Sequence, residues 1–440
     1  MKLAVIGSGI AGNSAALALA RRHDVTLYER RDRPGGHSAT VDLHYDGVHI
    51  PVDTGFIVYN TNNYPLLTKL FEHLGIQTTS TTMSFSVSLD QGRFEWCGDT
   101  IRTIFAQKSN LFSPGFFMML GDILRFNSLA KRDLEAGTLC GITFGDYIRS
   151  RGFSTRLRDD YIVPMTAAIW STPAARMLDF PAESLVRFLD NHRLIQLRRP
   201  CWRTVTGGSR NYVNALLNEF PGTLLLDNPV ERIIRQNGKV YVTGQDGHTR
   251  QFDGVVMASH SDQTLKMLAD CDSEETSVLS SIPYRPNRVW LHRDPSLMPR
   301  RKDAWAAWNY LGTKKPGSTR EITVTYWMNK LQNINTDYPI FITLNPQTEP
   351  REDLTFATFD YSHPQFDAAA LAAQARLPAI QGRNNTWYCG AWTRFGFHED
   401  GLASGLHAAS LLGCKAPWEA DDTMNIEAIP SQQAILEAVA

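Results

Sequence analysis

Residues 2–12 read KLAVIGSGIAG, and residues 13–29 continue as NSAALALARRHDVTLYE. Residues 2–6 form a short, apolar, β-branched run that is typical of a buried parallel strand. Residues 13–22 are rich in Ala and Leu, which favours a helix, and residues 25–28 form a second strand-like run that ends in Glu29. The order of strand, glycine-rich turn, helix, strand and acid predicts a dinucleotide-binding unit.

The three glycines of the turn each have a physical role. Gly7 permits a tight turn, Gly9 lets the backbone approach a pyrophosphate, and Gly12 lets the helix pack closely on the strand. The pyrophosphate would sit on the unpaired N–H groups at the start of the helix, and Glu29 would accept hydrogen bonds from a ribose hydroxyl. A secretory signal peptide is the alternative for this stretch, but glycines interrupt the apolar run, and the strand and acid that follow would have no purpose in one.

The composition bounds what the rest of the chain does. At 440 residues it holds roughly two to three domains. A net charge of −1 gives no electrostatic reason to expect nucleic acid. The six cysteines contain no C-x-x-C pair, so we expect no metal site, no disulfide framework and a cytoplasmic protein. No apolar run reaches the ~18 residues that a membrane span needs, so the protein is expected to be soluble or peripheral.

The residues after Glu29 narrow the cofactor. Residues 30–38 read RRDRPGGHS, so that an acid is followed by the glycine pair Gly35-Gly36 and then His37. This pattern resembles the flavin enzymes of the glutathione-reductase superfamily, and within them the branch of flavin amine oxidases, protoporphyrinogen oxidases and phytoene-type desaturases. The resemblance implies FAD, whereas a plain polar turn is the alternative for the glycine pair alone. A second G-x-G-x-x-G for NAD(P)H is absent, which argues against a pyridine-nucleotide reductase.

Two further motifs carry the same resemblance. A hairpin around Asp46-Gly47 leads to Asp53-Thr54-Gly55-Phe56, which in that family passes the isoalloxazine ring. Near the other end, a strand ending in Gly390-Ala391 is followed by a loop and a helix expected to start at Gly401. The resemblance implies that the start of this helix faces the flavin and stabilises negative charge on the reduced ring.

The resemblance assigns the site residue by residue. The residues it implies to contact FAD are Gly7, Ser8, Gly9, Ile10, Ala11, Gly12, Glu29, Arg30, Gly35, Gly36, His37, Ser38, Thr54, Gly55, Phe56, Val230, Ala258, Gly390, Ala391, Gly401, Leu402 and Ala403. The candidates for accepting a proton are His398, Tyr59 and His37. Phe56 and Tyr59 either face a substrate or simply fill the core. His398 falls where amine oxidases place an aromatic cage residue, which weakens the case for an amine substrate.

The predicted fold is α/β, with a Rossmann-like FAD-binding domain of the glutathione-reductase type. A discontinuous α+β substrate domain carries a mostly antiparallel sheet, for which the aromatic-rich residues 283–374 are suited. The expected boundaries are residues 1–80, 204–272 and 380–415 for the FAD domain, 81–203 and 273–379 for the substrate domain, and 416–440 for a C-terminal tail.

The apolar stretch within residues 110–132 admits two interpretations. Its large apolar side chains are bordered by Arg102, Lys108, Arg125, Lys131 and Arg132. An apolar helix with basic borders lies in a membrane interface or at the mouth of an apolar tunnel. The alternative is a buried helix of the substrate domain.

The sequence therefore predicts an FAD-dependent oxidoreductase that takes a hydride from an apolar or lipid substrate, with O2 or a quinone as electron acceptor. A methylated or otherwise modified fatty acyl chain is the expected substrate, because the resemblance extends to bacterial flavoproteins associated with such fatty acids. Two alternatives stay open, namely a flavin amine oxidase that releases an imine and H2O2, and a non-catalytic FAD-binding protein.

Overall fold

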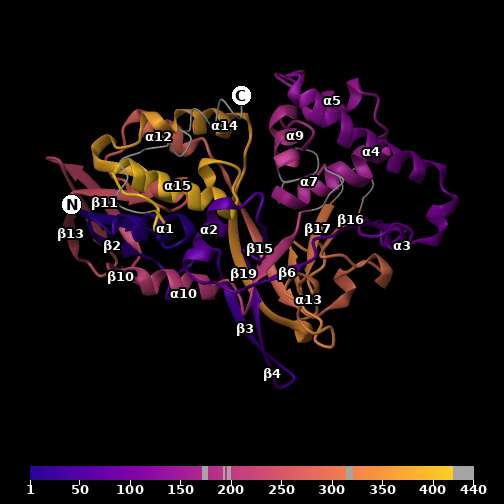
Figure 1. The fold of residues 1–440 in the computed structure, drawn as a ribbon, viewed down its shortest axis with the longest axis horizontal. Coiled ribbons are helices and arrows are strands. Elements are labelled where there is room, and N and C mark those ends of the chain that lie inside the picture. The colour runs from indigo at the N-terminus through magenta and orange to yellow at the C-terminus, as the bar shows by residue number, and fades with distance from the viewer. Residues whose placement is uncertain (171–176, 192–193, 196–199, 314–320, 420–440) are drawn as a thin grey trace.

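The computed structural model describes residues 1–170, 177–191, 194–195, 200–313 and 321–419 (Figure 1). It contains a five-stranded parallel sheet with helices, and a seven-stranded, mostly antiparallel sheet beside a helical lobe. The predicted α/β fold class is confirmed. Most of the predicted C-terminal tail, residues 420–440, lies outside the described residues.

The parallel sheet has β1 at its centre. Its strands, in spatial order, are β10 (Thr223–Leu225), β2 (Asp24–Tyr28), β1 (Lys2–Ile6), β14 (Gly254–Met257) and β20 (Thr386–Tyr388). Alternate side chains of these strands, such as Leu3 and Val5, pack on one helical layer. That layer consists of α1 (Ile10–Leu19), α2 (Pro65–His73), α10 (Arg210–Glu219) and α15 (His398–Leu411). Strands far apart in the sequence thus share one sheet, as the discontinuous arrangement requires.

The other face of the parallel sheet, which presents Ala4, Ile6 and Met257, is covered by a small antiparallel sheet and further helices. These elements are β11 (Val230–Gln236), β12 (Lys239–Gly244), β13 (Thr249–Phe252), α11 (Ser261–Met267), α12 (Ser273–Ser280) and α14 (Ala368–Arg376). The strands of the parallel sheet all fall within residues 1–80, 204–272 and 380–415, which we propose as the FAD domain. Helices α12 and α14 pack on this sheet although they fall within residues 273–379, the range predicted for the substrate domain.

The antiparallel sheet forms the other half of the molecule. Its strands, in spatial order, are β19 (Thr355–Pro364), β15 (Tyr284–His292), β18 (Phe341–Leu344), β17 (Glu321–Trp327), β16 (Trp308–Thr313), β7 (Phe85–Leu89) and β8 (Phe94–Cys97). Only the β16–β7 pair among these is parallel. The hairpin β3 (Thr40–Tyr45) and β4 (Val48–Asp53) packs its apolar side chains on this sheet, and its turn residues Asp46 and Gly47 have positive φ, as predicted.

Shorter elements complete the sheet region. They are β5 (Tyr59–Asn60), β6 (Thr78–Thr81), β9 (Trp202–Val205) and α13 (Met328–Leu331). The helical lobe lies beside the sheet (Figure 1) and has its own apolar core. It consists of α3 (Ile101–Ile104), α4 (Pro114–Glu135), α5 (Phe144–Ser150), α6 (Thr155–Leu157), α7 (Val163–Trp170) and α9 (Ala182–Asn191). Within the described part of the chain, no helix combines the length and hydropathy needed to cross a bilayer.

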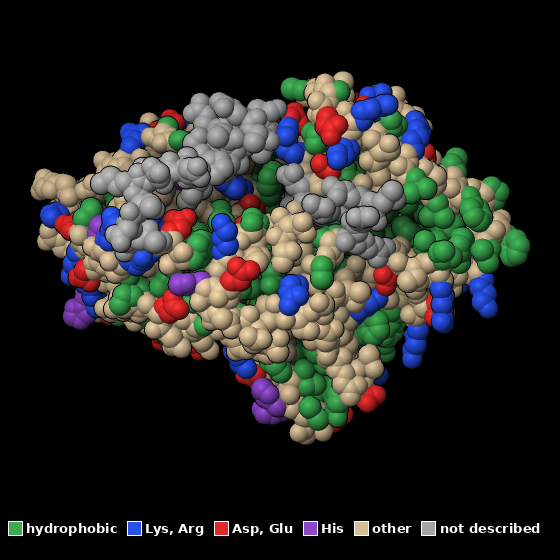
Figure 2. Space-filling view, viewed as in Figure 1, with side chains coloured by type: hydrophobic (Ala, Val, Ile, Leu, Met, Phe, Trp, Pro, Cys, Tyr) green, Lys and Arg blue, Asp and Glu red, His purple; other side chains and the backbone are tan. Residues whose placement is uncertain are grey.

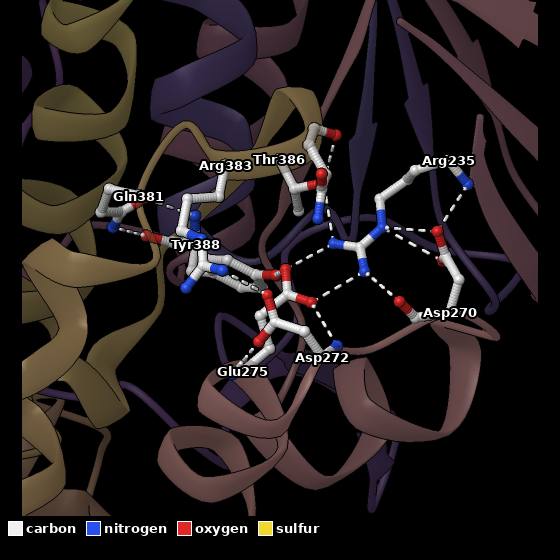
Figure 3. A network of polar contacts seen from close by, with 9 residues as sticks. Arg235, Asp270, Asp272, Glu275, Gln381, Arg383, Thr386 and Tyr388 are labelled. Carbon is white, nitrogen blue, oxygen red and sulfur yellow. Dashed lines mark hydrogen bonds and ion pairs between the residues drawn. The ribbon is translucent and has the colours of Figure 1, made fainter. Parts of the chain in front are cut away.

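A buried polar network fastens the small antiparallel sheet to the parallel one (Figure 3). Arg235 of β11 donates from Nη2 to Glu275 of α12 at 2.8 Å and from Nε to Asp270 at 3.1 Å. Tyr388 of β20 donates its hydroxyl to Glu275 at 2.6 Å. The side chains of Arg235 and Glu275 are 2% and 0% exposed, so each charge depends on the other for its stabilisation.

We expect Arg235→Met to lower the free energy of unfolding by about 3–5 kcal/mol, because it leaves the Glu275 carboxylate buried without its cation. Urea denaturation would measure the change. The matched control is Arg351→Met, whose pair with Asp353 is exposed and which should cost less than about 1 kcal/mol. Equal losses in the two variants would contradict the role of the network.

Candidate functional site

The glycine-rich turn has the geometry that its sequence predicts. Gly7 follows β1 with a φ of +105°, and a Cβ on Gly12 would lie 1.8 Å from the Gly7 carbonyl oxygen, so only glycine fits there. Gly9 is the N-cap of α1 and has an ordinary φ of −67°. Apart from its chain neighbours and the backbone of α1, no described atom lies within 4 Å of the position its Cβ would take. The turn therefore leaves open space at the positive end of α1, where a pyrophosphate would bind.

Glu29 lies buried at the end of β2, beside this turn. Its Oε2 accepts hydrogen bonds from the Ser8 N–H at 3.0 Å and the Ser8 hydroxyl at 2.6 Å, and its Oε1 accepts from the Arg31 N–H at 2.9 Å. The Asn228 N–H donates to the Glu29 carbonyl at 3.0 Å, which brings the residues just before Val230 to the same place. The predicted contacts Ser8 and Glu29 thus lie together, and the segment just before Val230 reaches the same end of the site.

The glycine pair and the Asp53–Phe56 motif lie next along the site. The Gly35 N–H donates to the Ser8 carbonyl at 2.9 Å, and a Cβ on Gly36 would lie 3.0 Å from the Gly9 Cα. A Cβ on Gly55 would lie 2.1 Å from the His37 carbonyl oxygen, so this crossing also requires glycine. Backbone contacts therefore bring the glycine-rich turn, the glycine pair and the Asp53–Phe56 motif side by side.

Ala258 and Arg30 were also predicted to contact FAD, and only Ala258 packs on the glycine-rich turn. Ala258, after β14, lies against it, because a Cβ on Gly12 would lie 3.1 Å from the Ala258 Cβ. Arg30 is exposed beside Glu29. The neighbouring Arg31, which the sequence did not single out, supplies the backbone hydrogen bond to Glu29.

The C-terminal motif reaches the same region, but its helix does not begin where the sequence predicted. Helix α15 starts at His398 rather than at Gly401, because Asp400 accepts from the Phe397 N–H at 2.9 Å and so caps an earlier turn. The Gly401 N–H is already bonded to the Phe397 carbonyl at 3.0 Å. The N–H groups at the open end of α15 therefore belong to residues 398–400 and not to Gly401, Leu402 and Ala403.

Gly401 has a packing role at that position. A Cβ there would lie 2.8 Å from Ile10 Cγ2 and 3.7 Å from Ala391, so the glycine allows α15 to approach the start of α1. Gly390, just before Ala391, has a φ of +148° and is held by Ser404, whose hydroxyl oxygen accepts from the Gly390 N–H at 2.8 Å. Leu402 and Ala403 are buried in the same contact.

His398 forms an aromatic pair with Phe56. The two rings stack with centroids 4.0 Å apart and planes 12° from parallel. Nε2 of His398 lies 2.7 Å from the Tyr212 hydroxyl, which in turn contacts the Ser38 hydroxyl. Burial lowers the pKa of His398 to about 3 and raises that of Tyr212, so both groups are neutral at physiological pH. This pair is flat, half-buried and uncharged.

A second cluster surrounds His37. The centroid of its ring lies 5.1 Å from that of Tyr361 and 5.7 Å from that of His363, both on β19. The ring centroid of His260, which follows β14, is 6.3 Å away. Burial lowers the pKa of His260 and of His363 to about 4. Burial, then the adjacent histidines and Arg31, hold the pKa of His37 well below its ordinary value. Sequence reasoning found only His37, because the others stand on strands and loops without a motif.

The nearby carboxylates are already engaged by donors. Asp53 accepts from the Ser209 N–H at 2.9 Å and from the Thr40 hydroxyl at 2.6 Å. Glu399 accepts from the first N–H groups of α2, those of Leu66 at 2.7 Å and Leu67 at 3.0 Å. Burial raises the pKa of Asp53 to about 6 and that of Glu399 to about 7. The hydrogen bonds of these two carboxylates stabilise the N-terminal ends of α10 and α2.

Tyr59 lies apart from this arrangement. Its ring is buried and packs on Phe71 and Tyr64, and its hydroxyl donates to Thr78 at 3.4 Å. This position matches the core-filling alternative. No group of three or more His, Cys, Asp or Glu side chains that could hold a metal ion occurs among the described residues.

Comparison with known proteins gives the class. The family model "Flavin containing amine oxidoreductase" matches residues 10–301, about two thirds of the chain. The chain belongs to this family and is an FAD-dependent oxidoreductase. No curated protein matches the sequence.

Solved structures share the fold at low identity. A fatty acid isomerase from P. acnes, which produces CLA, is 16% identical with a TM-score of 0.61, over 93% of this chain and 97% of that one. Cyclohexylamine oxidase from Brevibacterium oxydans is 16% identical with a TM-score of 0.63, over 93% and 98%. Putrescine oxidase is 13% identical with a TM-score of 0.64, over 94% and 99%.

The residues of the site fit FAD. The open space at Gly9 lies at the start of α1, and His37 Nε2 is buried without a hydrogen-bond partner among the described residues. The arginines of residues 30–33 supply positive charge that a diphosphate would offset. Gly9, Gly36, Glu29 and His37 would hold the cofactor from the adenosine end toward the Phe56–His398 pair.

We expect Gly9→Ala to weaken FAD binding at least about tenfold, because the new methyl group occupies the space above α1. The backbone at Gly9 suits alanine, so the melting temperature of the apoprotein should not change. Fluorescence titration with FAD would measure the affinity. Gly121→Ala is the matched control, since Gly121 also has open space, on α4. Unchanged affinity in Gly9→Ala would contradict the location of the pyrophosphate.

A second prediction concerns stability and pH. His363 has a folded-state pKa of about 4, below the unfolded value of 6.5, so its contribution is complete above pH 6.5 and is lost toward pH 4. Between pH 7 and 5 the wild type should lose about 2 kcal/mol more than His363→Gln. Urea denaturation at both pH values measures this difference, with His248→Gln on an exposed turn as the control. Parallel losses in wild type and His363→Gln would refute it.

Proposed function

We propose that this enzyme oxidises an apolar substrate, taking a hydride from one carbon and a proton from its neighbour so that a C=C bond forms. The proposed substrate class is a methylated or otherwise modified fatty acyl chain. FAD, when bound, supplies the hydride acceptor, and O2 or a membrane quinone then takes the electrons. The observation that carries the proposal is the neutral, stacked pair of Phe56 and His398.

An uncharged pair favours an uncharged reacting group. Placing an ammonium in a buried site is costly unless a carboxylate or an aromatic cage compensates for its lost hydration. Asp53 and Glu399 are engaged by backbone N–H groups, and His398 replaces a cage aromatic. A hydrocarbon chain has no such requirement and gains free energy from burial beside Phe56.

The proton acceptor that fits best is His398. Its low pKa makes it a weak base, yet the ring stands against Phe56, and its Nε2 belongs to a hydrogen-bonded chain with Tyr212 and Ser38. His37, whose Nε2 is buried without a hydrogen-bond partner among the described residues, fits a role in holding the cofactor. Tyr59 fits the core. We therefore propose His398 as the catalytic residue among the three candidates.

Amine oxidation is the second candidate function. Its support is the family itself and two of the similar structures, a putrescine oxidase and a cyclohexylamine oxidase. The fatty acid isomerase of the same fold supports the lipid substrate instead. Because all three are under 25% identical to this chain, the choice between them depends on the chemistry of the site. We further propose a cytoplasmic location, with peripheral contact at the inner face of the membrane.

Anaerobic titration of the FAD-loaded protein distinguishes the two. We expect methyl-branched fatty acyl lipids to bleach the visible flavin absorbance and to lose two hydrogens by mass spectrometry, and putrescine and cyclohexylamine to leave the flavin oxidised. Bleaching by the amines and not by the lipids would overturn the proposal in favour of an amine oxidase.

A variant tests the role of His398. His398→Phe keeps a flat ring against Phe56 and removes the nitrogen, so the rate constant of flavin reduction should fall about 100-fold while FAD stays bound. Stopped-flow absorbance measures the rate, and His248→Phe on an exposed turn serves as the control. An unchanged rate in His398→Phe would exclude His398 as the proton acceptor.

A further inference from the structure

Large apolar side chains are exposed together at one end of the helical lobe. Of the ten exposed large hydrophobic residues in the described part of the chain, six fall between residues 101 and 124. They are Ile101, Leu111, Phe112, Phe117, Met118 and Leu124, which we call the apolar tip. Ile101 and Phe112 are 80% and 87% exposed. Such clustering marks an interaction surface rather than scattered surface apolar residues.

Helix α4, which carries part of the apolar tip, packs on the antiparallel sheet. On the opposite face of α4, Phe116 and Met119 are fully buried against Trp96 and Val87 of the antiparallel sheet. The first half of α4 is thus apolar on both faces, with the sheet covering only one of them. A helix that is apolar all round needs an apolar neighbour on each side. The exposed apolar face of α4 therefore belongs to a helix whose opposite face is packed in the core.

The tip is convex and bordered by positive charge. Figure 1 shows α3 and the start of α4 at the far end of the molecule from the parallel sheet, and Figure 2 shows hydrophobic side chains gathered there with Lys and Arg along the edge. Residues 101–132 contain five basic residues and one acidic one, in a chain whose net charge is −1. Lys302 adds a further exposed cation beside Lys108, whereas Asp303 pairs with Arg102 at 3.1 Å and offsets one of these charges.

We propose that the apolar tip inserts into the surface of an anionic lipid membrane. Two copies of this chain meeting at their tips would bring like charges together, whereas anionic headgroups attract them. A convex apolar surface with a basic border is suited to the boundary between headgroups and acyl chains. The proposal assigns the peripheral membrane contact proposed above to this surface, and it holds whatever the flavin oxidises.

Flotation of the full-length, FAD-loaded protein with vesicles of phosphatidylcholine and phosphatidylglycerol tests it. Wild type should float with these vesicles and much less with phosphatidylcholine alone. Phe112→Ser with Phe117→Ser should lower the partition coefficient at least about tenfold. Lys108→Glu with Lys131→Glu should lower it at least about fivefold on the anionic vesicles. The matched control, Leu226→Ser with Leu411→Ser, removes exposed apolar residues elsewhere and should float as wild type does.

Several results would overturn the proposal. One is failure of wild type to float with either vesicle, and another is unchanged flotation of the Phe112 and Phe117 variant. A dimer in sedimentation velocity that this variant dissociates, without vesicle binding, would assign the tip to a second copy. Melting temperature and FAD absorbance, which should equal those of wild type, verify that the variants fold. Flavin reduction by lipid or amine is measured separately, so failure of the substrate proposal leaves the flotation result standing.

Discussion

The close packing of α1 between β1 and α15 is the constraint on which the rest of the site depends. A Cβ on Gly12 would lie 1.8 Å from the Gly7 carbonyl, and one on Gly405 would lie 2.1 Å from the Ala11 carbonyl. The helix therefore has no freedom to shift on either side. The first turn of α1, which Gly9 caps, therefore keeps its position, and the C-terminal motif packs on the same helix. A cofactor spanning this region would meet groups already placed by backbone contact, which lowers the entropy lost on binding.

His37 stands where the two sheets meet, and its surroundings couple cofactor binding to the fold. It touches a residue after β14 on one side and two residues of β19 on the other. Burial is the main cause of the low pKa of His37, and the positive potential of the nearby Arg31 lowers it further. A diphosphate would reverse that potential and stabilise the arginines. The same negative charge would raise the pKa of His37, so binding of the cofactor and protonation of the cluster are thermodynamically linked.

Local signals explain what the sequence predicted. The strand, turn and helix of residues 2–29 and the hairpin at Asp46-Gly47 depend on short-range rules, and the structure has them. The start of α15 was predicted wrongly, because the boundary was placed at the glycine. The side chain of Asp400 caps the helix one turn earlier. His260, His363 and Tyr212 were missed because long-range packing, not a motif, brings them to the site. The stretch at 110–132 allowed two interpretations, because hydropathy alone does not show which face of a helix a neighbour covers.

The site and the apolar tip share one physical preference, although they lie on different parts of the fold. Around His398, the carboxylates that could attract a cation accept hydrogen bonds from backbone N–H groups. They therefore stabilise the fold and are not available to pair with a substrate cation. At the tip, aliphatic and aromatic side chains stay exposed where charged ones would be expected on a water-facing helix. A polar substrate would gain little from either arrangement. A molecule that partitions into a bilayer would be concentrated at the tip and accepted without a desolvation penalty at the Phe56–His398 pair. The two features together favour lipid chemistry over amine chemistry more strongly than either does alone.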